Sequence, residues 1–410
     1  MESAPDINAL DGPRSIAYHT ALRDASRPYP EDPTVNFEIQ QETLQKALDL
    51  VSGVVPGKTT LPILTCVLIE ADEEGLKFSA TNLDISLVTQ VREVEIAEEG
   101  RAAVPSNKLV SFVRSLAPGS VQVTVDGGKC TLRAGKASFE ESCMNAEEYP
   151  SLPAVASGDG LEVPGEVLSA MIAETSYSVS RDETRPALMG ILWEVRSDGL
   201  TMVATDAHRL ARSHRAIEWS YDGERNLIVD TGGLRHLPRI TGQGDQDATT
   251  EVFLGENQLS FRSGDTLLHI RLLEGPFPEY NAVIPKNNDK LVVVDREALA
   301  QAIRRVSITA DRITSQIKLG VESGRLELSA RGSDGSRAED EVPVSYDGDA
   351  LEVGFNFGYL LDILKNVRAD SVQISLRDPQ SAALVAPLGE DGEADPGLLC
   401  LLMPLRLAGD

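Results

Sequence analysis

The segment GLTMVATDAHRLA, at Gly199–Ala211, occurs in this chain in three versions. The other two are GLKFSATNLDISL at Gly75–Leu87 and GRLELSARGSDGSR at Gly324–Arg337, so the copies start 124 and 125 residues apart. Each begins with glycine, continues with largely alternating apolar and polar residues, and then has the turn-like residues TNLD, TDAH or RGSD. Such a pattern predicts a β-strand with one buried face, and its recurrence indicates a structural unit that repeats along the chain.

The sequence on either side of these segments repeats as well. A strand-like run and a helical pattern precede each copy, and a second helical pattern and two strand-like runs follow it. The first pattern starts at Val35, Leu161 and Leu291, and the second at Pro105, Asp230 and Phe355. These observations predict three copies of an α+β unit, each with two helices and antiparallel sheets and long enough for its own core. We expect domains at 35–157, 158–287 and 288–410.

Two segments fall outside the repeat. Residues 1–34 are polar, contain several prolines and lack periodicity, a composition that cannot bury enough apolar surface to offset the entropy of ordering. We expect a flexible N-terminal extension there. The stretch PLGEDGEADPG at 387–397 is acidic and rich in turn formers, which predicts an exposed loop between two strands.

The composition limits the possible partners. The chain of 410 residues has a formal net charge of −26, so its outer surface should repel nucleic acid and membranes, and any nucleic-acid site must be local. It has no apolar run long enough to span a bilayer, and its N-terminus lacks the features of a signal peptide, which predicts a cytoplasmic protein. The cysteines have no CxxC spacing, so neither a disulfide framework nor a metal site is expected; they are Cys66, Cys130, Cys143 and Cys400.

Positive charge is concentrated in four of the six predicted helices. Residues 107–116, 230–240, 297–306 and 359–369 carry eight basic and three acidic residues in total, whereas the helices near 42–52 and 165–175 are not basic. If the helices share one face of an assembly, that face offers phosphates a positive track that does not depend on base sequence. The alternative is that these basic residues simply lie on solvent-exposed helix faces and bind no ligand.

Two motifs suggest enzymatic chemistry, and both are incomplete. SGVVPGKTT at 52–60 approaches a phosphate-binding loop, but Ser52 replaces its first glycine, and a helical pattern precedes it where a strand is required. Asp206 and His208 could act as an acid and a base, but the equivalent turns lack histidine and no nucleophile completes a triad. A hydrolase or nucleotide-using enzyme on Asp206/His208 or Gly57–Thr59 therefore stays the second hypothesis. For Asp206 we favour a turn in which its carboxylate accepts from local amides.

Five segments, in order along the chain, match one known family. They are TLPILTCVLIEA at 60–71, FSATNLDISL at 78–87, ATDAHRLA at 204–211, EGPFPEYNAVIPK at 274–286 and LLMPLRL at 401–407. Together they resemble the bacterial DNA polymerase III beta sliding clamps, over Val35 to Leu407. The resemblance implies a head-to-tail homodimer whose six domains form a ring, with helices lining the hole and sheets outside. It also implies a processivity factor that encircles double-stranded DNA without sequence preference, has no catalytic activity and needs no cofactor.

The implied partners are a clamp loader, the replicative polymerase alpha subunit and other proteins with a clamp-binding motif. They would bind a pocket between the second and third domains, where an apolar cleft with a few polar groups can hold an extended peptide. The positions that match the family's pocket are Leu188, Thr205, Ala207, His208, Arg209, Leu210, Pro278, Val283, Leu401, Met403, Pro404, Leu405 and Arg406. Departures are Ala207 for the usual glycine, Ala282 where some members have arginine, and the added Ala408–Asp410 tail.

The resemblance also suggests DNA contacts at Lys58 and in the loop around Arg181 and Arg185, although Pro186 and Ala187 replace aromatic residues found there in some relatives. To these the helix charges add Arg114, Arg239, Arg304 and Lys365. A specialised paralogue that no longer supports replication is a third hypothesis.

Overall fold

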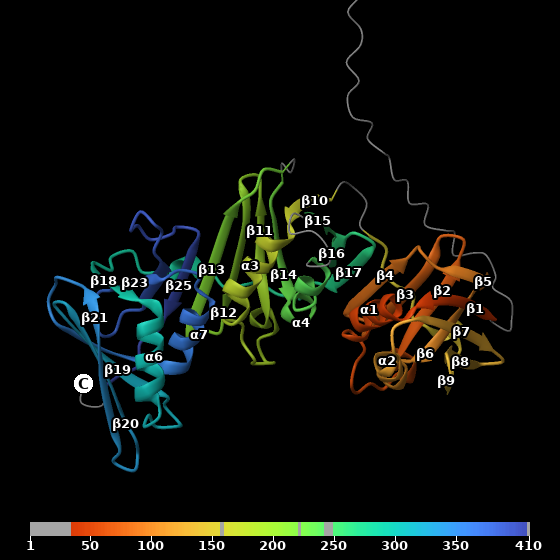
Figure 1. The fold of residues 1–410 in the computed structure, drawn as a ribbon. Helices are drawn as coiled ribbons and strands as arrows, with labels where there is room; N and C mark the ends of the chain where they lie inside the picture. Colours follow the sequence, from red (N-terminus) through yellow and green to blue (C-terminus); the bar gives the residue numbers. More distant parts are fainter. Residues whose placement is uncertain (1–33, 156–159, 220–222, 242–248, 408–410) are drawn as a thin grey trace, which may run out of the picture.

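The computed structural model describes residues 34–155, 160–219, 223–241 and 249–407. The expected extension and the tail at 408–410 lie outside these residues, apart from Thr34. Figure 1 shows three α+β units side by side in chain order, which confirms the repeat. Within the described residues, no helix has both the length and the apolar character required to cross a membrane.

The first domain follows the predicted order of strand, helix, hairpin strands, helix and closing strands. A helix precedes Gly57–Thr59, and a short 3-10 helix and then a strand follow it, whereas a phosphate-binding loop requires a strand before it. Its elements are β1 (Val35–Gln40), α1 (Gln41–Ser52), η1 (Pro62–Thr65), β2 (Cys66–Asp72), β3 (Gly75–Thr81), β4 (Ile85–Val91), β5 (Glu95–Glu98), β6 (Gly100–Pro105), α2 (Ser106–Ser115), β7 (Ser120–Asp126), β8 (Lys129–Ala134) and β9 (Ala137–Ser142), followed by η2 (Ala146–Glu148).

The second domain departs from the prediction at its second helix. The helix expected over 230–240 is two short helices, because Gly232 and Gly233 weaken the first turn and Pro238 cannot continue the hydrogen bonds of an existing helix. Its elements are β10 (Leu161–Pro164), α3 (Gly165–Ser176), η3 (Pro186–Met189), β11 (Gly190–Arg196), β12 (Gly199–Thr205), β13 (Arg209–Ala216), β14 (Arg225–Asp230), α4 (Thr231–Leu234), α5 (Leu237–Thr241), β15 (Thr249–Leu254), β16 (Gln258–Ser263) and β17 (Thr266–Arg271), followed by η4 (Tyr280–Ala282).

The third domain has well-capped helices. The Asp295 carboxylate accepts from the Ala298 amide, and the Asn356 side chain accepts from Gly358 and Tyr359. Helix α7 ends at Asn366, so Arg368 lies beyond the helix in which it was counted. The elements are β18 (Lys290–Asp295), α6 (Arg296–Ser307), β19 (Gln316–Glu322), β20 (Arg325–Arg331), β21 (Arg337–Ser345), β22 (Leu351–Asn356), α7 (Phe357–Asn366), β23 (Ser371–Leu376), β24 (Ala383–Pro387) and β25 (Leu398–Leu402), with the predicted exposed loop between the last two.

The same packing recurs in each core. The first helix of every domain lies on two adjacent strands of its hairpin sheet, one of them the outer strand: α1 on β3 and β4, α3 on β12 and β13, and α6 on β20 and β21. The fourth residue of that helix is Leu44, Leu168 or Leu299, and each is at most 1% exposed. Burying a leucine side chain contributes about 1.5–3 kcal/mol, so this position helps to anchor all three cores.

Two sheets run without interruption across domain boundaries. Strand β17 of the second domain pairs with β4 of the first, and β25 of the third pairs with β13 of the second, both antiparallel. At the first joint the Thr89 and Thr266 hydroxyls are 2.9 Å apart. The domains are therefore joined by backbone ladders as well as by their linkers.

Two of the open strand edges lie at positions that form a joint elsewhere in the chain. Strand β9 ends the five-stranded sheet, and β21 pairs with β20 along Arg337–Pro343 but reaches β18 only at Val344 and Ser345. Among the described residues no strand lies on the outer side of either edge. Strands β9 and β21 occupy the positions that β17 and β4 occupy at the first joint.

The outer faces of the hairpin sheets, on the side away from the helices, differ among the domains. Leu68 in the first domain and Leu192 in the second are buried there beneath Tyr149 and Tyr280, which come from the linkers that follow those domains. Strand pairing places Lys318 at the equivalent position of the third domain, opposite Ser329. The third outer face is thus polar where the others are apolar.

Candidate partner-binding and DNA-binding sites

The segment from Thr205 to Arg209 forms a tight turn between β12 and β13. One carboxylate oxygen of Asp206 accepts from the amides of His208 and Arg209, at 2.9 and 3.0 Å, and the Thr205 hydroxyl accepts from Ala207. The turn predicted for Asp206 is confirmed. Ala207 has φ of 76°, in the left-handed region that favours glycine. The alanine that replaces the family's usual glycine at 207 is therefore in a strained backbone conformation.

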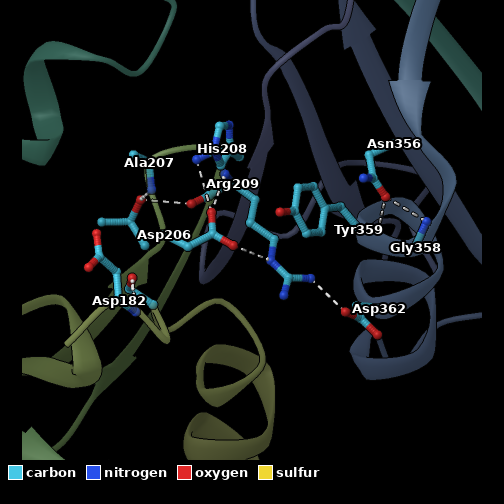
Figure 2. A network of polar contacts seen from close by, with 11 residues as sticks. Asp182, Asp206, Ala207, His208, Arg209, Asn356, Gly358, Tyr359 and Asp362 are labelled. Atoms are coloured by element: carbon cyan, nitrogen blue, oxygen red, sulfur yellow. Dashed lines mark hydrogen bonds and ion pairs between the residues drawn. The ribbon is translucent and has the colours of Figure 1, made fainter. Parts of the chain in front are cut away.

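Arg209 connects the turn to the third domain (Figure 2). Its guanidinium donates to Asp206 at 3.1 Å and to Asp362 of α7 at 2.6 Å. It also lies over the rings of Tyr359 and Tyr177, at 4.4 and 5.4 Å from their centroids. Desolvation strengthens both kinds of contact, and Arg209 is only 8% exposed. Arg209 therefore has a structural role at the joint between the domains.

Leu210 and Leu401 belong to one apolar cluster that spans the joint. They are paired across the β13–β25 ladder, and each is 2% exposed. The cluster also contains Leu192, Val203, Ile228, Tyr280 and Ala382, with Ala187, Leu273, Phe277, Ile284, Leu384 and Leu399 partly buried against it. The expected pocket residues at 210 and 401 thus lie together.

Two other expected pocket residues are exposed apolar side chains. Met403 is 41% exposed, and its amide donates to the carbonyl of His208 at 2.9 Å, which places the C-terminal strand beside the turn. Val283 is 57% exposed and follows Tyr280 of the cluster. Met403 follows Leu401 by two residues and Val283 follows Tyr280 by three, so both exposed apolar side chains are close in sequence to the buried cluster.

The remaining expected pocket residues lie on several segments and differ in their burial. Leu188 is buried beside Ala187, whereas Pro278 is exposed on the linker. Pro404 and Leu405 are half-buried, and the Leu405 amide donates to Gly354. Arg406 is exposed, with its backbone carbonyl accepting from Gln316. Sequence reasoning did not identify Tyr177, Tyr359 and Asp362. Tyr359 and Asp362 become neighbours of Arg209 only through the β13–β25 joint, and Tyr177 through the packing of α3 on β13.

Three of the expected DNA contacts occupy equivalent positions. Arg114, Arg239 and Lys365 each lie nine residues after the cap of the second helical segment, and all three are exposed. Arg114 is held by Asp49 at 2.7 Å. Across the parts of the chain that the structure covers, no acidic side chain forms an ion pair with Arg239 or Lys365, which leaves both charges available.

The other expected contacts lie in loops or on a first helix. Lys58 and Arg181 follow α1 and α3 on exposed loops, and neither forms an ion pair within the described ranges. Arg185 pairs with Asp182, and Arg304 pairs with Glu297. The loop after α6 carries exposed Arg312, which sequence reasoning missed although it follows its helix as Arg181 follows α3.

The histidines and cysteines of the described residues do not form a metal site. Within the described residues, no cluster of three or more potential metal ligands is present. Burial, with a smaller effect of neighbouring arginines, lowers the pKa of His236 and of His269 to about 4, so both are neutral near pH 7. Cys66, Cys130 and Cys400 are buried, Cys143 is half-buried, and all four are free thiols.

Sequence models of one family match the chain in three consecutive parts. They describe the N-terminal domain of the DNA polymerase III beta subunit at residues 35–153, the central domain at 162–279 and the C-terminal domain at 281–399. Similar curated proteins include the beta sliding clamps of Pseudomonas putida, at 33% identity, and of Escherichia coli K12, at 30%. Each match covers 91% of this chain and 100% of the relative.

Solved structures of the same kind superpose closely. The sliding clamp of Pseudomonas aeruginosa bound to griselimycin has a TM-score of 0.86 at 32% identity, covering 91% of this chain and 100% of that one. The C. crescentus beta sliding clamp has a TM-score of 0.85 at 30% identity, covering 92% and 100%.

Proposed function

We propose, on the premise that this chain belongs to the DNA polymerase III beta subunit family, that two copies close head to tail into a ring around duplex DNA. The family consists of DNA sliding clamps, which are processivity factors and not enzymes, and that is the function of this chain. The ring, its domain limits at 157/158 and 287/288, its individual contacts and its cytoplasmic location are our proposals.

The open edges of β9 and β21 carry the ring proposal. Within the chain, the closing strand of one domain pairs with the hairpin sheet of the preceding domain, as β17 does with β4 and β25 with β13. The closing strand of the first domain, β9, and the hairpin strand of the third, β21, have no such partner among the described residues. Head-to-tail pairing of β9 with β21 of a second copy would satisfy both edges, and two such joints would close a dimer.

The register of this joint follows from the first one. Thr266 lies opposite Thr89 and Leu268 opposite Leu87. Transfer to the equivalent strands puts Phe139 opposite Ala338 of the second copy, Lys136 opposite its Glu341, and Glu140 opposite its Arg337. The joint would therefore contain two cross-strand pairs of opposite charge. Such pairs contribute about 0.2–1 kcal/mol each and specify the register.

An exposed isoleucine supports the same joint. The residue after the first helix is Gly53, Tyr177 or Ile308 in the three domains. A side chain at Gly53 would meet His236 of the second domain, and Tyr177 packs against the core of the third. Ile308 is 83% exposed, and the repeat places it against α2 of the second copy. Its burial there would contribute about 1.5–3 kcal/mol.

For DNA we propose a track made of Arg114, Arg239 and Lys365, together with Lys58, Arg181, Arg185, Arg304 and the added Arg312. The first three recur at one position of the repeat, so a ring of two chains would present six such charges to the duplex. Contacts to phosphates do not depend on base sequence and therefore permit sliding.

For partner proteins, including the polymerase alpha subunit and the clamp loader, we propose the surface around Leu210, Leu401, Val283 and Met403. A buried apolar floor with exposed apolar residues suits an extended peptide that inserts leucine- or phenylalanine-like side chains. Replacing Met403 and Leu405 together by alanine should weaken the binding of a clamp-motif peptide, measured by fluorescence anisotropy, without changing the oligomeric state.

The experiment that tests the ring is retention on circular DNA. The protein is loaded onto a nicked plasmid with an ATP-driven clamp loader and isolated in moderate salt, and the plasmid is then linearised. Topological encirclement predicts that the protein stays on the circle and leaves the linear form, because ordinary phosphate binding weakens with salt and ignores circularity. Equal retention on both forms contradicts the proposal.

A further inference from the structure

We propose that residues 28–33 of one copy, PYPEDP, bind the outer face of the third domain of the other copy and so span the joint that closes the ring. Since this contact forms only between copies, it rests on the ring proposed above. In this arrangement the N-terminal extension would cover the outer face of a neighbouring domain, as each of the two internal linkers does within the chain.

The internal linkers cover the domain that precedes them. Residues 143–160 lead to β10 and residues 272–289 lead to β18, 18 residues in each case. Tyr149 of the first linker donates its hydroxyl to the carbonyls of Cys66 and Ser79, and Tyr280 of the second donates to the Glu194 carboxylate at 2.7 Å. Both rings are at most 9% exposed. Each intrachain joint is thus crossed by a segment that anchors a tyrosine on the outer face of the preceding domain.

The N-terminal extension is the third segment of this kind. It precedes β1 as the linkers precede β10 and β18, and its 34 residues exceed the length of either linker. It contains Tyr29 between Pro28 and Pro30, whereas Pro150 follows Tyr149 and Pro278 lies two residues before Tyr280. From Tyr29 to β1 the chain can extend about 20 Å. The family match starts at residue 35, so this extension is an addition to the family's domains.

The outer face of the third domain has a hollow to receive it. The hollow measures about 790 Å³, and its lining includes Gln316, Lys318, Ser329, Arg331, Arg337 and Leu351. No linker follows this domain within the described residues, and Leu407, the last of them, lies at the edge of the hollow. The outer face that a linker covers in the other two domains is therefore open here.

The charges of the two surfaces are complementary. Lys318 stands where the covered faces have Leu68 and Leu192, and it pairs with Glu352 at 2.6 Å. Arg331 is exposed and forms no ion pair in the part of the chain that the structure describes. Asp311, also at the hollow, already accepts from the amides of Ile313 and Thr314. The extension carries Glu31 and Asp32 directly after its Tyr-Pro pair, so a polar segment meets a polar face.

The hollow is continuous with the proposed joint. Arg337 lines the hollow and is also the first residue of β21, the strand assigned to β9 of the second copy. The extension of that second copy leads into β1, which lies in the same five-stranded sheet as its β9. A segment leaving β1 would therefore start close to the face that it covers.

Photocrosslinking of the full chain tests the contact. Tyr29→p-benzoylphenylalanine is mixed with a tagged second copy, irradiated and mapped by mass spectrometry. We expect crosslinks between copies at 316–331 and 351–352, and few from the matched Tyr18→p-benzoylphenylalanine, which is in the extension but has no flanking prolines. Crosslinks within one copy, crosslinks to a different partner in a cell extract, or no crosslinks overturn the proposal.

Subunit exchange provides a second readout, measured by energy transfer between labelled copies. Tyr29→Ala and Arg331→Glu should each speed exchange about tenfold, the effect of a contact worth about 1.4 kcal/mol. Tyr18→Ala and Lys77→Glu, the latter on the covered face of the first domain, should exchange at the unmodified rate. Equal rates for all four variants overturn the contact. Sedimentation equilibrium separates the two failures: a monomeric full chain refutes the ring, whereas a dimer without crosslinks refutes only the bound extension.

Discussion

The guanidinium of Arg209 in the second domain lies over the ring of Tyr359 in the third, with its carbon 4.4 Å from the ring centroid. Arg209 directly follows His208, whose carbonyl accepts from the Met403 amide. The residue that fastens the two domains thus adjoins the surface proposed to bind peptides. A substitution at 209 should affect both the joint and peptide binding.

Arg209→Ala should lower the free energy of unfolding by about 2–3 kcal/mol, since it leaves Asp206 half-buried without its cation and removes a desolvated stacking contact. Urea unfolding measures the change. Arg368→Ala removes an exposed arginine from the same region and should stay within about 0.5 kcal/mol of the unmodified chain. Equal effects of the two variants would show that Arg209 is not a structural contact.

Ala207→Gly should stabilise the protein by about 1 kcal/mol, because alanine at φ of 76° carries a steric cost that glycine does not. The matched control is Ala211→Gly in β13, a buried position, which should destabilise. Thermal unfolding of the two variants compares them. A lower melting temperature for Ala207→Gly would contradict the strain assigned to this turn.

Ile308→Asp should convert the dimer into monomers, because it places a charge in an apolar contact at the proposed joint. Analytical ultracentrifugation measures the change. The control is Ile313→Asp. Ile313 is 92% exposed but does not occupy the position directly after the first helix that Gly53, Tyr177 and Ile308 share, so its replacement should shift the monomer–dimer equilibrium less.

The register of the joint can be tested by charge reversal. Lys136→Glu or Glu341→Lys alone should raise the dimer dissociation constant, and the double variant should restore much of the affinity, since the two residues are assigned to face each other. Additive losses in the double variant would mean that the register is wrong.

Arg239→Ala and Lys365→Ala should each reduce the salt dependence of DNA binding, lowering the slope of log K against log salt by about 0.9 per contact. Anisotropy with a short duplex at increasing salt measures this slope. Arg114→Ala should have a smaller effect because Asp49 already compensates its charge. Arg325→Ala, in a β20 ion pair, is the control and should leave the slope unchanged.

The two buried histidines should make the protein less stable as the pH falls from about 6.5 towards 4. Both have a folded-state pKa of about 4, below the usual 6.5, so the unfolded chain binds more protons within this window. Each histidine contributes a slope of up to about 1.4 kcal/mol per pH unit. Urea unfolding at pH 7 and pH 5 should show a shallower dependence for His236→Gln and His269→Gln. The same dependence in all three proteins would refute this account.

Most of the fold could be predicted because the sequence contains it three times. The periodicity around Gly75, Gly199 and Gly324 predicts the order of strands and helices in each unit, and comparison among the copies compensates for weak signals in any one of them. The helix over 230–240 is the exception. There Gly232, Gly233 and Pro238 outweigh the pattern inferred from the other copies.

The site was less accessible from sequence, for a physical reason. Leu210 and Leu401 could be named by resemblance, but their pairing depends on a ladder between strands nearly two hundred residues apart. The ion pairs of Arg114 with Asp49 and of Arg304 with Glu297 likewise depend on the local geometry of side chains. Net charge along 107–116 counts Arg114 as free, although Asp49 of α1 already compensates its charge.

In the proposed ring, the joint between copies would unite unlike edges, β9 on one side and β21 on the other, so each molecule that joins would leave one edge exposed until the last meets the first. Closure after two chains depends on the sheet twist at the internal joints, where Thr266 pairs with Thr89 and Leu402 with Arg209. A substitution that alters either twist changes the pitch of the whole chain. Further copies would then add end to end, and a closed ring would become an open fibre. If the proposed ring forms, the internal ladders would therefore govern the number of subunits without contacting the second copy.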